Sequence, residues 1–178
     1  MRAARHKLGI LTALAVSAFF ACAGPDIAAP TPPAVVSQRG ISTPGTNLIE
    51  CPTNENQTAT AVVTPLGGTL SVGGTSVVIP AGALVSTANV TVTIPASNIL
   101  EIDVSVDGLP HFIFASPITV TVSYARCNRS NIDHSPLTVW YIDSETKALI
   151  EPMGGIDNKL LQTVTFTTGH LSGYAVAN

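Results

Sequence analysis

The sequence predicts an all-β protein built around a single antiparallel β-sandwich. Three observations support this fold class. Short stretches alternate between apolar and polar residues, turn signals recur between them, and no segment of 12 or more residues carries a helical apolar stripe. The apolar content is mostly Val, Ile, Ala and Leu interleaved with Thr and Ser, which favours sheet. A chain of 178 residues is long enough for one such domain with additional segments.

Residues 1–21 have the pattern of an export signal. Arg2, Arg5 and Lys7 precede an apolar run from Leu8 to Ala21. Fourteen residues are too few to span a bilayer comfortably, and they suit the apolar region of a signal peptide. An uncleaved signal anchor is the alternative interpretation.

Cys22 follows this run in the stretch Phe19-Phe20-Ala21-Cys22, which resembles the bacterial lipobox. The resemblance implies that Cys22 is lipidated, so that the N-terminal lipid anchors an exported protein in the bacterial cell envelope. Cleavage by ordinary signal peptidase after Ala23 is the alternative, and it would discard Cys22. Residues 22–50 are rich in proline and poor in charge, which predicts a lipidated cysteine followed by a flexible, disordered tether. A disordered terminus without a role has the same composition.

The domain is expected at residues 51–178. Gly73-Gly74 lies between two apolar runs and predicts a two-residue hairpin turn. Strands are predicted at Thr58–Thr64, Thr69–Ile79 (the hairpin), Asn89–Ile94, Glu101–Val106, His111–Phe114, Ile118–Tyr124, Leu137–Ile142, Ala148–Met153, Thr163–Thr167 and Leu171–Ala177. Many short strands with frequent turns indicate a sandwich of the immunoglobulin-like type.

Alternation along these strands also predicts which side chains face the core. Ile102, Val104 and Val106 are expected inside, which places Glu101 and Asp103 on the solvent side. In the strand Leu137–Ile142, Trp140 is expected in the core, with Tyr141 half exposed.

Three motifs carry a family resemblance: Gly67-Gly68 through Leu84 (GGTLSVGGTSVVIPAGAL), Phe114-Ala115-Ser116-Pro117, and His170-Leu171-Ser172-Gly173-Tyr174. Together they resemble the ZU-five domain of zonula occludens proteins, netrin receptors and ankyrins. The resemblance covers roughly Thr58 to Val176. It implies a β-sandwich used mostly for interaction rather than for chemistry on small molecules.

Two cysteines remain once Cys22 is set aside, and an even pair in an exported chain suggests a Cys51–Cys127 disulfide. Closing a loop of 77 residues would stabilise the fold by about 4–5 kcal/mol in the chain-entropy model. Two free buried cysteines are the alternative.

His170-Leu171-Ser172 is the strongest candidate for chemistry, because it resembles the autoproteolysis motif of some ZU-five domains and of adhesion receptors. The resemblance implies that His170 deprotonates Ser172, whose oxygen attacks the Leu171 carbonyl in an N→O acyl shift. A strained turn, permitted by Gly169 and Gly173, would be needed. The alternative, which we favour, is a structural role at a strand start without cleavage.

The sequence gives little support for binding of nucleic acid, a metal or a cofactor. Beyond residue 21 the net charge is about −6 without a basic cluster, which argues against a nucleic-acid partner. His111, Asp133, His134 and Asp143 lack the spacing of a metal-ligand motif, so neither a metal nor another cofactor is expected. We therefore expect a non-enzymatic envelope lipoprotein whose domain contacts a protein or a glycan. A self-cleaving processing switch and a purely structural surface module are the alternative functions.

Overall fold

The computed structural model describes residues 47–109, 111–128, 132 and 135–178. The expected signal peptide, Cys22, most of the tether, Asp133 and His134 lie outside these residues. The described part of the chain contains strands and turns but no helix, and so no helix in it is long and apolar enough to cross a membrane.

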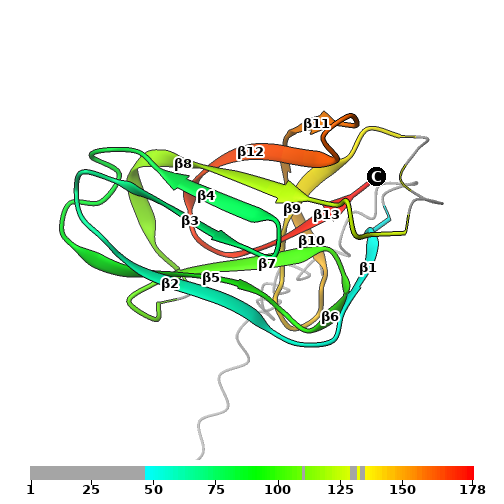
Figure 1. Ribbon diagram of the computed structural model, residues 1–178, viewed down its shortest axis with the longest axis horizontal. Helices are drawn as coiled ribbons and strands as arrows, with labels where there is room; N and C mark the ends of the chain where they lie inside the picture. The colour runs from blue at the N-terminus through cyan, green and yellow to red at the C-terminus, as the bar shows by residue number, and fades with distance from the viewer. Residues whose placement is uncertain (1–46, 110, 129–131, 133–134) are drawn as a thin grey trace, which may run out of the picture. The chain divides into compact units, whose positions relative to one another are not determined.

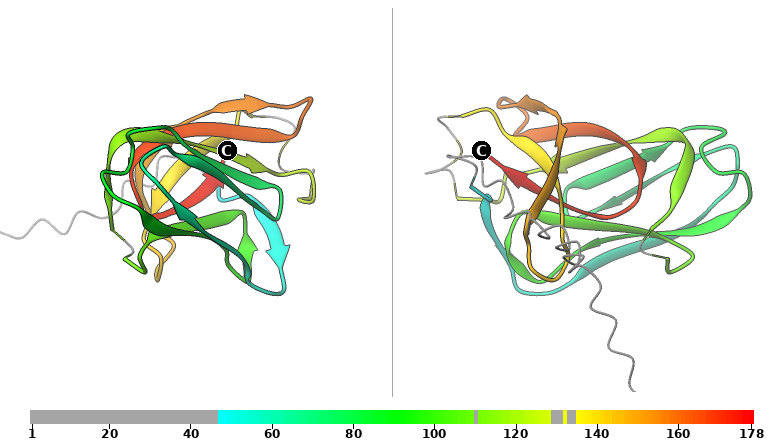
Figure 2. Two further views of the ribbon diagram at one scale, coloured as in Figure 1. Left: turned by 60° about the vertical axis from the view of Figure 1, so that its left-hand side comes forward. Right: turned by 180° about the vertical axis from the view of Figure 1, so that it is seen from behind.

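The described strands form a β-sandwich, as the sequence predicts. A six-stranded antiparallel sheet has the order β10-β9-β13-β7-β5-β2, and a five-stranded antiparallel sheet has the order β11-β12-β8-β4-β3. Figure 1 shows these sheets as two layers, and Figure 2 shows them from two further directions. A separate small sheet pairs β1 with β6. The bounds are β1 Glu50–Thr53, β2 Gln57–Val63, β3 Gly68–Val72, β4 Thr75–Ile79, β5 Ala88–Ile94, β6 Ser97–Ile99, β7 Glu101–Val106, β8 Ile113–Ser123, β9 Thr138–Ile142, β10 Leu149–Gly154, β11 Ile156–Asn158, β12 Thr163–His170 and β13 Gly173–Ala177.

The hairpin between β3 and β4 forms where the glycine pair predicts it. Gly73 and Gly74 have φ angles of 54° and 82°, and Val72 pairs with Thr75 across the turn. Two consecutive left-handed residues define the turn type whose twist matches that of the flanking strands. Glycine accepts this conformation without a Cβ penalty, which explains the local sequence.

One strand is longer than the sequence suggests. Residues 111–114 and 118–124 were expected to form separate strands, yet β8 runs without a break from Ile113 to Ser123. Pro117 lies inside it, and the register against β12 shifts between Thr168 and His170, opposite this part of β8. A proline that donates no hydrogen bond is tolerated where a ladder is irregular, so it bends the strand pairing without ending the strand.

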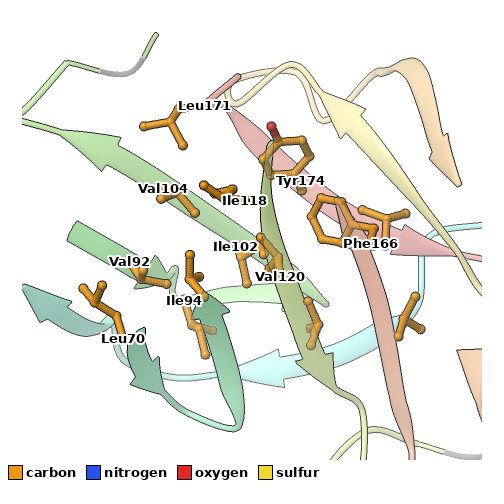
Figure 3. Packing of buried hydrophobic residues seen from close by; sticks show 14 of the residues in the cluster. Leu70, Val92, Ile94, Ile102, Val104, Ile118, Val120, Phe166, Leu171 and Tyr174 are labelled. Atoms are coloured by element: carbon orange, nitrogen blue, oxygen red, sulfur yellow. The ribbon is translucent and has the colours of Figure 1, made fainter. Parts of the chain in front are cut away.

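The core lies between the two large sheets and consists of the inward side chains that alternation predicts. Ile102, Val104 and Val106 of β7 are at most 2% exposed. Figure 3 shows residues of both layers meeting, among them Val104 of β7 and Ile118 of β8. Phe166 of β12 packs against Tyr174 of β13 with ring centroids 5.1 Å apart. The contacts therefore join strands of opposite sheets, as burial of one face of each sheet requires.

The domain starts earlier than the expected boundary at residue 51. The amide of Asn47 donates to the carbonyl of Asn178, and Ile49 donates to Val176 and is buried. The residues just before Cys51 therefore pair with the last strand. Their low charge and irregular composition continue that of the expected tether, so the sequence offers no boundary signal there.

The expected Cys51–Cys127 disulfide is present, and both residues are buried. It joins β1 to the segment that follows β8. Arg126 reinforces the same junction, because its Nη1 donates to the carbonyl oxygens of Cys51 and Pro52 at 3.3 and 3.2 Å. Burial lowers the pKa of this guanidinium.

Candidate functional site

An open cleft of about 480 Å³ lies where the six-stranded sheet is incomplete. Strand β13 begins only at Gly173, which pairs with Ile142 of β9 on one side and with Asp103 of β7 on the other. Strand β7 continues beyond that row, while the chain before Gly173 arrives from β12 of the other sheet. This missing length of β13 leaves a notch between β7 and the β9–β10 turn. The notch is lined by Asp103, Val104, Ser105, His111, Tyr141, Ile142, Asp143, Ser144, Glu145, Ile150, Ser172 and Gly173.

The absence of a side chain at Gly173 makes room at the floor of the notch. A Cβ atom at this position would lie 2.8 Å from the Oγ of Ser144 and 2.9 Å from the Oδ1 of Asp103. Both distances are below any normal contact of a Cβ. Two polar side chains, one from the turn after β9 and one from β7, thus converge over this glycine.

The Asp103 carboxylate carries unused hydrogen-bonding capacity, since it accepts no hydrogen bond from any described residue. Burial raises its pKa, the neighbouring Glu101 carboxylate raises it further, and Lys147 partly opposes both effects. A carboxylate that is partly desolvated and unbonded retains a strong tendency to accept hydrogen bonds or to meet a cation.

Ser172 is the second polar group at the floor. The residue is only 8% exposed, lines the notch and makes no hydrogen bond through its hydroxyl within the described part of the chain. Tyr141 supplies an aromatic wall and also packs against the core. Tyr141 is half-buried, as expected, but the expected core position of Trp140 was wrong, because Trp140 is also only half-buried and Tyr141 is the one that packs against the core. Tyr141 lies on the same face of β9 as the buried residue Val139, and this face meets the core.

Glu101 corrects a second expectation, since it is buried and not solvent-facing. It is 2% exposed, and its Oε2 accepts a 2.7 Å hydrogen bond from the Nζ of Lys147. Its Oε1 is buried without a partner among the described residues. Lys147 comes from the β9–β10 turn, so a cation distant in sequence neutralises a carboxylate that alternation placed outside.

The rim of the notch is a well-defined turn. The Oδ1 of Asp143 accepts hydrogen bonds from the amides of Glu145 and Thr146 and from the hydroxyl of Thr146, at 2.7–3.0 Å. The hydrogen bonds from Thr146 and Glu145 lower the pKa of Asp143, so it is ionised at neutral pH. His111 also lines the notch. His111 and Asp143, two of the four residues considered above as metal ligands, therefore both line the notch.

The His170-Leu171-Ser172 motif lies at the crossover from β12 to β13. The His170 ring faces an aromatic cluster: it packs edge-on against Tyr141, with centroids 5.7 Å apart, and its Nδ1 lies 3.5 Å from the Tyr174 hydroxyl. No hydrogen bond joins His170 to Ser172 in the described chain. Neither Gly169 nor Gly173 adopts a left-handed conformation. The base and the hydroxyl of the motif thus contact different surroundings.

Tyr174 organises the crossover. Its hydroxyl donates to the His170 carbonyl and lies 2.9 Å from the Oγ1 of Thr168. Burial raises the pKa of Tyr174 to about 12, although the hydrogen bond with Thr168 lowers it. Leu171 is fully buried, and its amide donates to the carbonyl of Phe112. This network explains the motif as a structural junction between the two sheets.

A second cluster of charged groups has a structural role. Asp157 of β11 accepts hydrogen bonds from the Tyr124 hydroxyl and the Leu137 amide and pairs with Lys159 at 2.9 Å. Lys159 also donates to the carbonyls of Ile132 and Ser135. Burial raises the pKa of Asp157, but the bonds from Leu137, Lys159 and Tyr124 outweigh it and lower the pKa. The cluster fastens the loop after β8 to the edge of the sheet.

Sequence reasoning missed the notch because its residues come from five separate stretches, namely 103–105, 111, 141–145, 150 and 172–173. Only the pairing of Gly173 with both Asp103 and Ile142 brings three of those stretches together. The described residues contain no group of three His, Cys, Asp or Glu side chains arranged to hold a metal ion. No protein-family model matches the chain, and no curated protein matches it.

Proposed function

We propose that this protein is a non-enzymatic, lipid-anchored binding protein of the bacterial cell envelope, and that its notch holds part of a partner. The single observation that carries the binding role is the floor of the notch. Asp103 and Ser172 both face an open cleft with hydrogen-bonding capacity that no described residue uses. Because exposed concave sites with convergent polar groups are typical of ligand sites, this arrangement favours binding. The resemblance to the ZU-five domain supports interaction as well.

A matched pair of glycine variants tests the binding role. Gly173→Ala places a methyl group against Asp103 and Ser144, whereas Gly169→Ala adds one where no atom lies within 4 Å. The ¹⁵N-labelled mature chain is titrated with a library of short peptides and a library of oligosaccharides. We expect at least one compound to shift the amides of notch residues in wild type and in Gly169→Ala, and much less in Gly173→Ala. A result in which every compound leaves the notch amides unmoved would refute the binding role.

The lipid anchor at Cys22 is tested by metabolic labelling with a palmitate analogue. Wild type is expected to take up the label and to fractionate with membranes, and Cys22→Ser is expected to do neither. Equal labelling of both chains, or a mature N-terminus at Gly24, would contradict the anchor.

The non-enzymatic part of the proposal predicts that the chain stays intact at Leu171-Ser172. The intact mass under denaturing conditions is the direct measurement. A species that lacks residues 172–178, and that disappears in Ser172→Ala, would instead establish the self-cleaving switch.

A further inference from the structure

The residues that line the notch have an unbalanced charge. Three carboxylates line it, those of Asp103, Asp143 and Glu145, and no lysine or arginine is among the lining residues. Lys147 is the nearest base in the same turn, but it is held by Glu101 at 2.7 Å. Lys147 therefore offsets the negative charge of the notch only in part, and His111 is the one lining residue that can carry a positive charge.

The three carboxylates differ in what they can offer to a ligand. Asp143 already accepts three hydrogen bonds within its own turn through one oxygen. Glu145 is exposed at the rim, where it attracts a cation at longer range. Asp103 lies at the floor and accepts no hydrogen bond from a described residue, so it is the group with the most to gain from a donor.

The other groups at the floor fit the same kind of ligand. Ser172 is 8% exposed and its hydroxyl makes no hydrogen bond within the described chain, so it offers an oxygen to the same cleft as Asp103. Tyr141 offers an aromatic ring, which attracts a cation through its quadrupole. A volume of about 480 Å³ is ample for one long side chain.

We propose that the notch accepts a single cationic side chain of a protein partner, the ammonium group of a lysine or the guanidinium group of an arginine. The cation donates hydrogen bonds to the Asp103 carboxylate and the Ser172 hydroxyl and lies against the Tyr141 ring. Asp143 and Glu145 attract it from the rim. This inference rests on the proposed binding function and names the chemistry of its ligand.

Charge distinguishes this ligand from a glycan. A neutral sugar hydroxyl donates a hydrogen bond but brings no positive charge to the three carboxylates. A cation satisfies both requirements of a partly desolvated carboxylate, because it donates hydrogen bonds and offsets the charge. The raised pKa of Asp103 agrees with a carboxylate that lacks such a partner in the free protein.

Four defined probes test the inference on the ¹⁵N-labelled mature chain: acetyl-Gly-Lys-Gly-amide, the same peptide with arginine, the same peptide with Nε-acetyl-lysine, and the neutral disaccharide cellobiose. We expect the lysine or arginine peptide to shift the amides of Ser105, Ser144 and Gly173 in a saturable way. The acetyl-lysine peptide keeps the shape of lysine and removes its charge, so we expect it to bind at least about tenfold more weakly.

Two charge-matched variants locate the effect. Asp103→Asn removes the floor carboxylate, and we expect it to weaken the binding of the cationic peptides about tenfold. Glu151→Gln changes the net charge equally on exposed β10, outside the notch, and we expect less than a twofold change. If Asp103→Asn does not fold, Gly173→Ala is the second variant, since it acts on the same floor through volume.

The outcomes separate this inference from the proposed function. Equal binding of the lysine and acetyl-lysine peptides would overturn the inference that the notch binds a cationic side chain. Equal weakening of peptide binding by Asp103→Asn and Glu151→Gln would overturn it as well. Saturable binding of cellobiose in the notch without binding of either cationic peptide would also overturn it, while leaving the notch as a binding site. If none of the four probes moves the notch amides, the cation inference fails, whereas the binding role is judged by the wider libraries.

Discussion

Removal of the Cys51–Cys127 disulfide is the perturbation whose magnitude follows most directly from the structure. The two cysteines are separated by 76 positions, so the bond closes a loop of 77 residues. The chain-entropy relation assigns to such a loop a stabilisation of about 4.5 kcal/mol at 25 °C. Residual structure in the unfolded chain reduces this value, so we expect a loss of about 3–4.5 kcal/mol in the free energy of unfolding.

The double variant Cys51→Ala/Cys127→Ala measures this loss by urea unfolding followed by tryptophan fluorescence. The domain has roughly 130 residues, for which a loss of about 4.5 kcal/mol corresponds to a fall of about 16 °C in Tm. We also expect the dependence of free energy on urea to steepen, because the unfolded chain exposes more surface without its cross-link.

Reduced wild type is the control for this measurement. It lacks the cross-link but keeps both side chains, whereas the double variant also loses two buried sulfur atoms. Agreement within about 1 kcal/mol between the two would assign the effect to loop closure rather than to packing. A loss below about 1 kcal/mol in both would refute the reasoning, and would indicate that Arg126 and the strand pairing of β1 hold the junction without the bond.

Three further predictions concern stability. Lys147→Met leaves the Glu101 carboxylate buried without a counter-charge, so it should lower the free energy of unfolding, measured with urea, by about 2–3 kcal/mol. The double variant Lys147→Met/Glu101→Met should recover most of this lost stability. Equal losses of stability in the single and the double variant would contradict a stabilising ion pair. Gly67 and Gly82 have nearly the same φ, 83° and 81°, but a Cβ at Gly67 would strike the Ile79 carbonyl and the Pro80 backbone, while one at Gly82 meets nothing. Gly82→Ala should therefore cost about 1 kcal/mol and Gly67→Ala about 3 kcal/mol or more, and similar Tm values for both would contradict the clash. Asp157 has a lowered pKa in the folded state, so its contribution to stability is present above the unfolded pKa of about 3.9 and is lost as pH falls through the folded pKa. The difference in stability between wild type and Asp157→Asn should consequently shrink from pH 7 to pH 3. A difference that stays constant over this range would show that the stabilisation does not depend on ionisation of the Asp157 carboxylate.

The sequence by itself determined the features that depend on local rules. Period-two alternation identified most strands, because one face of each sheet must leave water while the other stays in it. Gly73-Gly74 identified a hairpin, since few residues other than glycine accept two left-handed positions in succession. The two cysteines that remain once Cys22 is set aside, in a chain predicted to be exported, identified the disulfide.

Only the tertiary structure decided the features that depend on neighbours across strands. Glu101 occupies an outward position in its own strand, yet it is buried and paired with Lys147, which lies 46 positions away. Tyr141 rather than Trp140 packs against the core because the face of β9 that carries Val139 and Tyr141 is the one turned toward the other sheet.

The notch itself exists because β13 begins at Gly173, in the row where β9 ends at Ile142, while β7 continues to Val106 on the other side. A binding site made of residues near positions 103, 142 and 172 leaves no periodic or spaced pattern in the sequence, since contact between strands is set by sheet order. Sheet order in turn reflects the packing of whole layers, which local alternation does not encode.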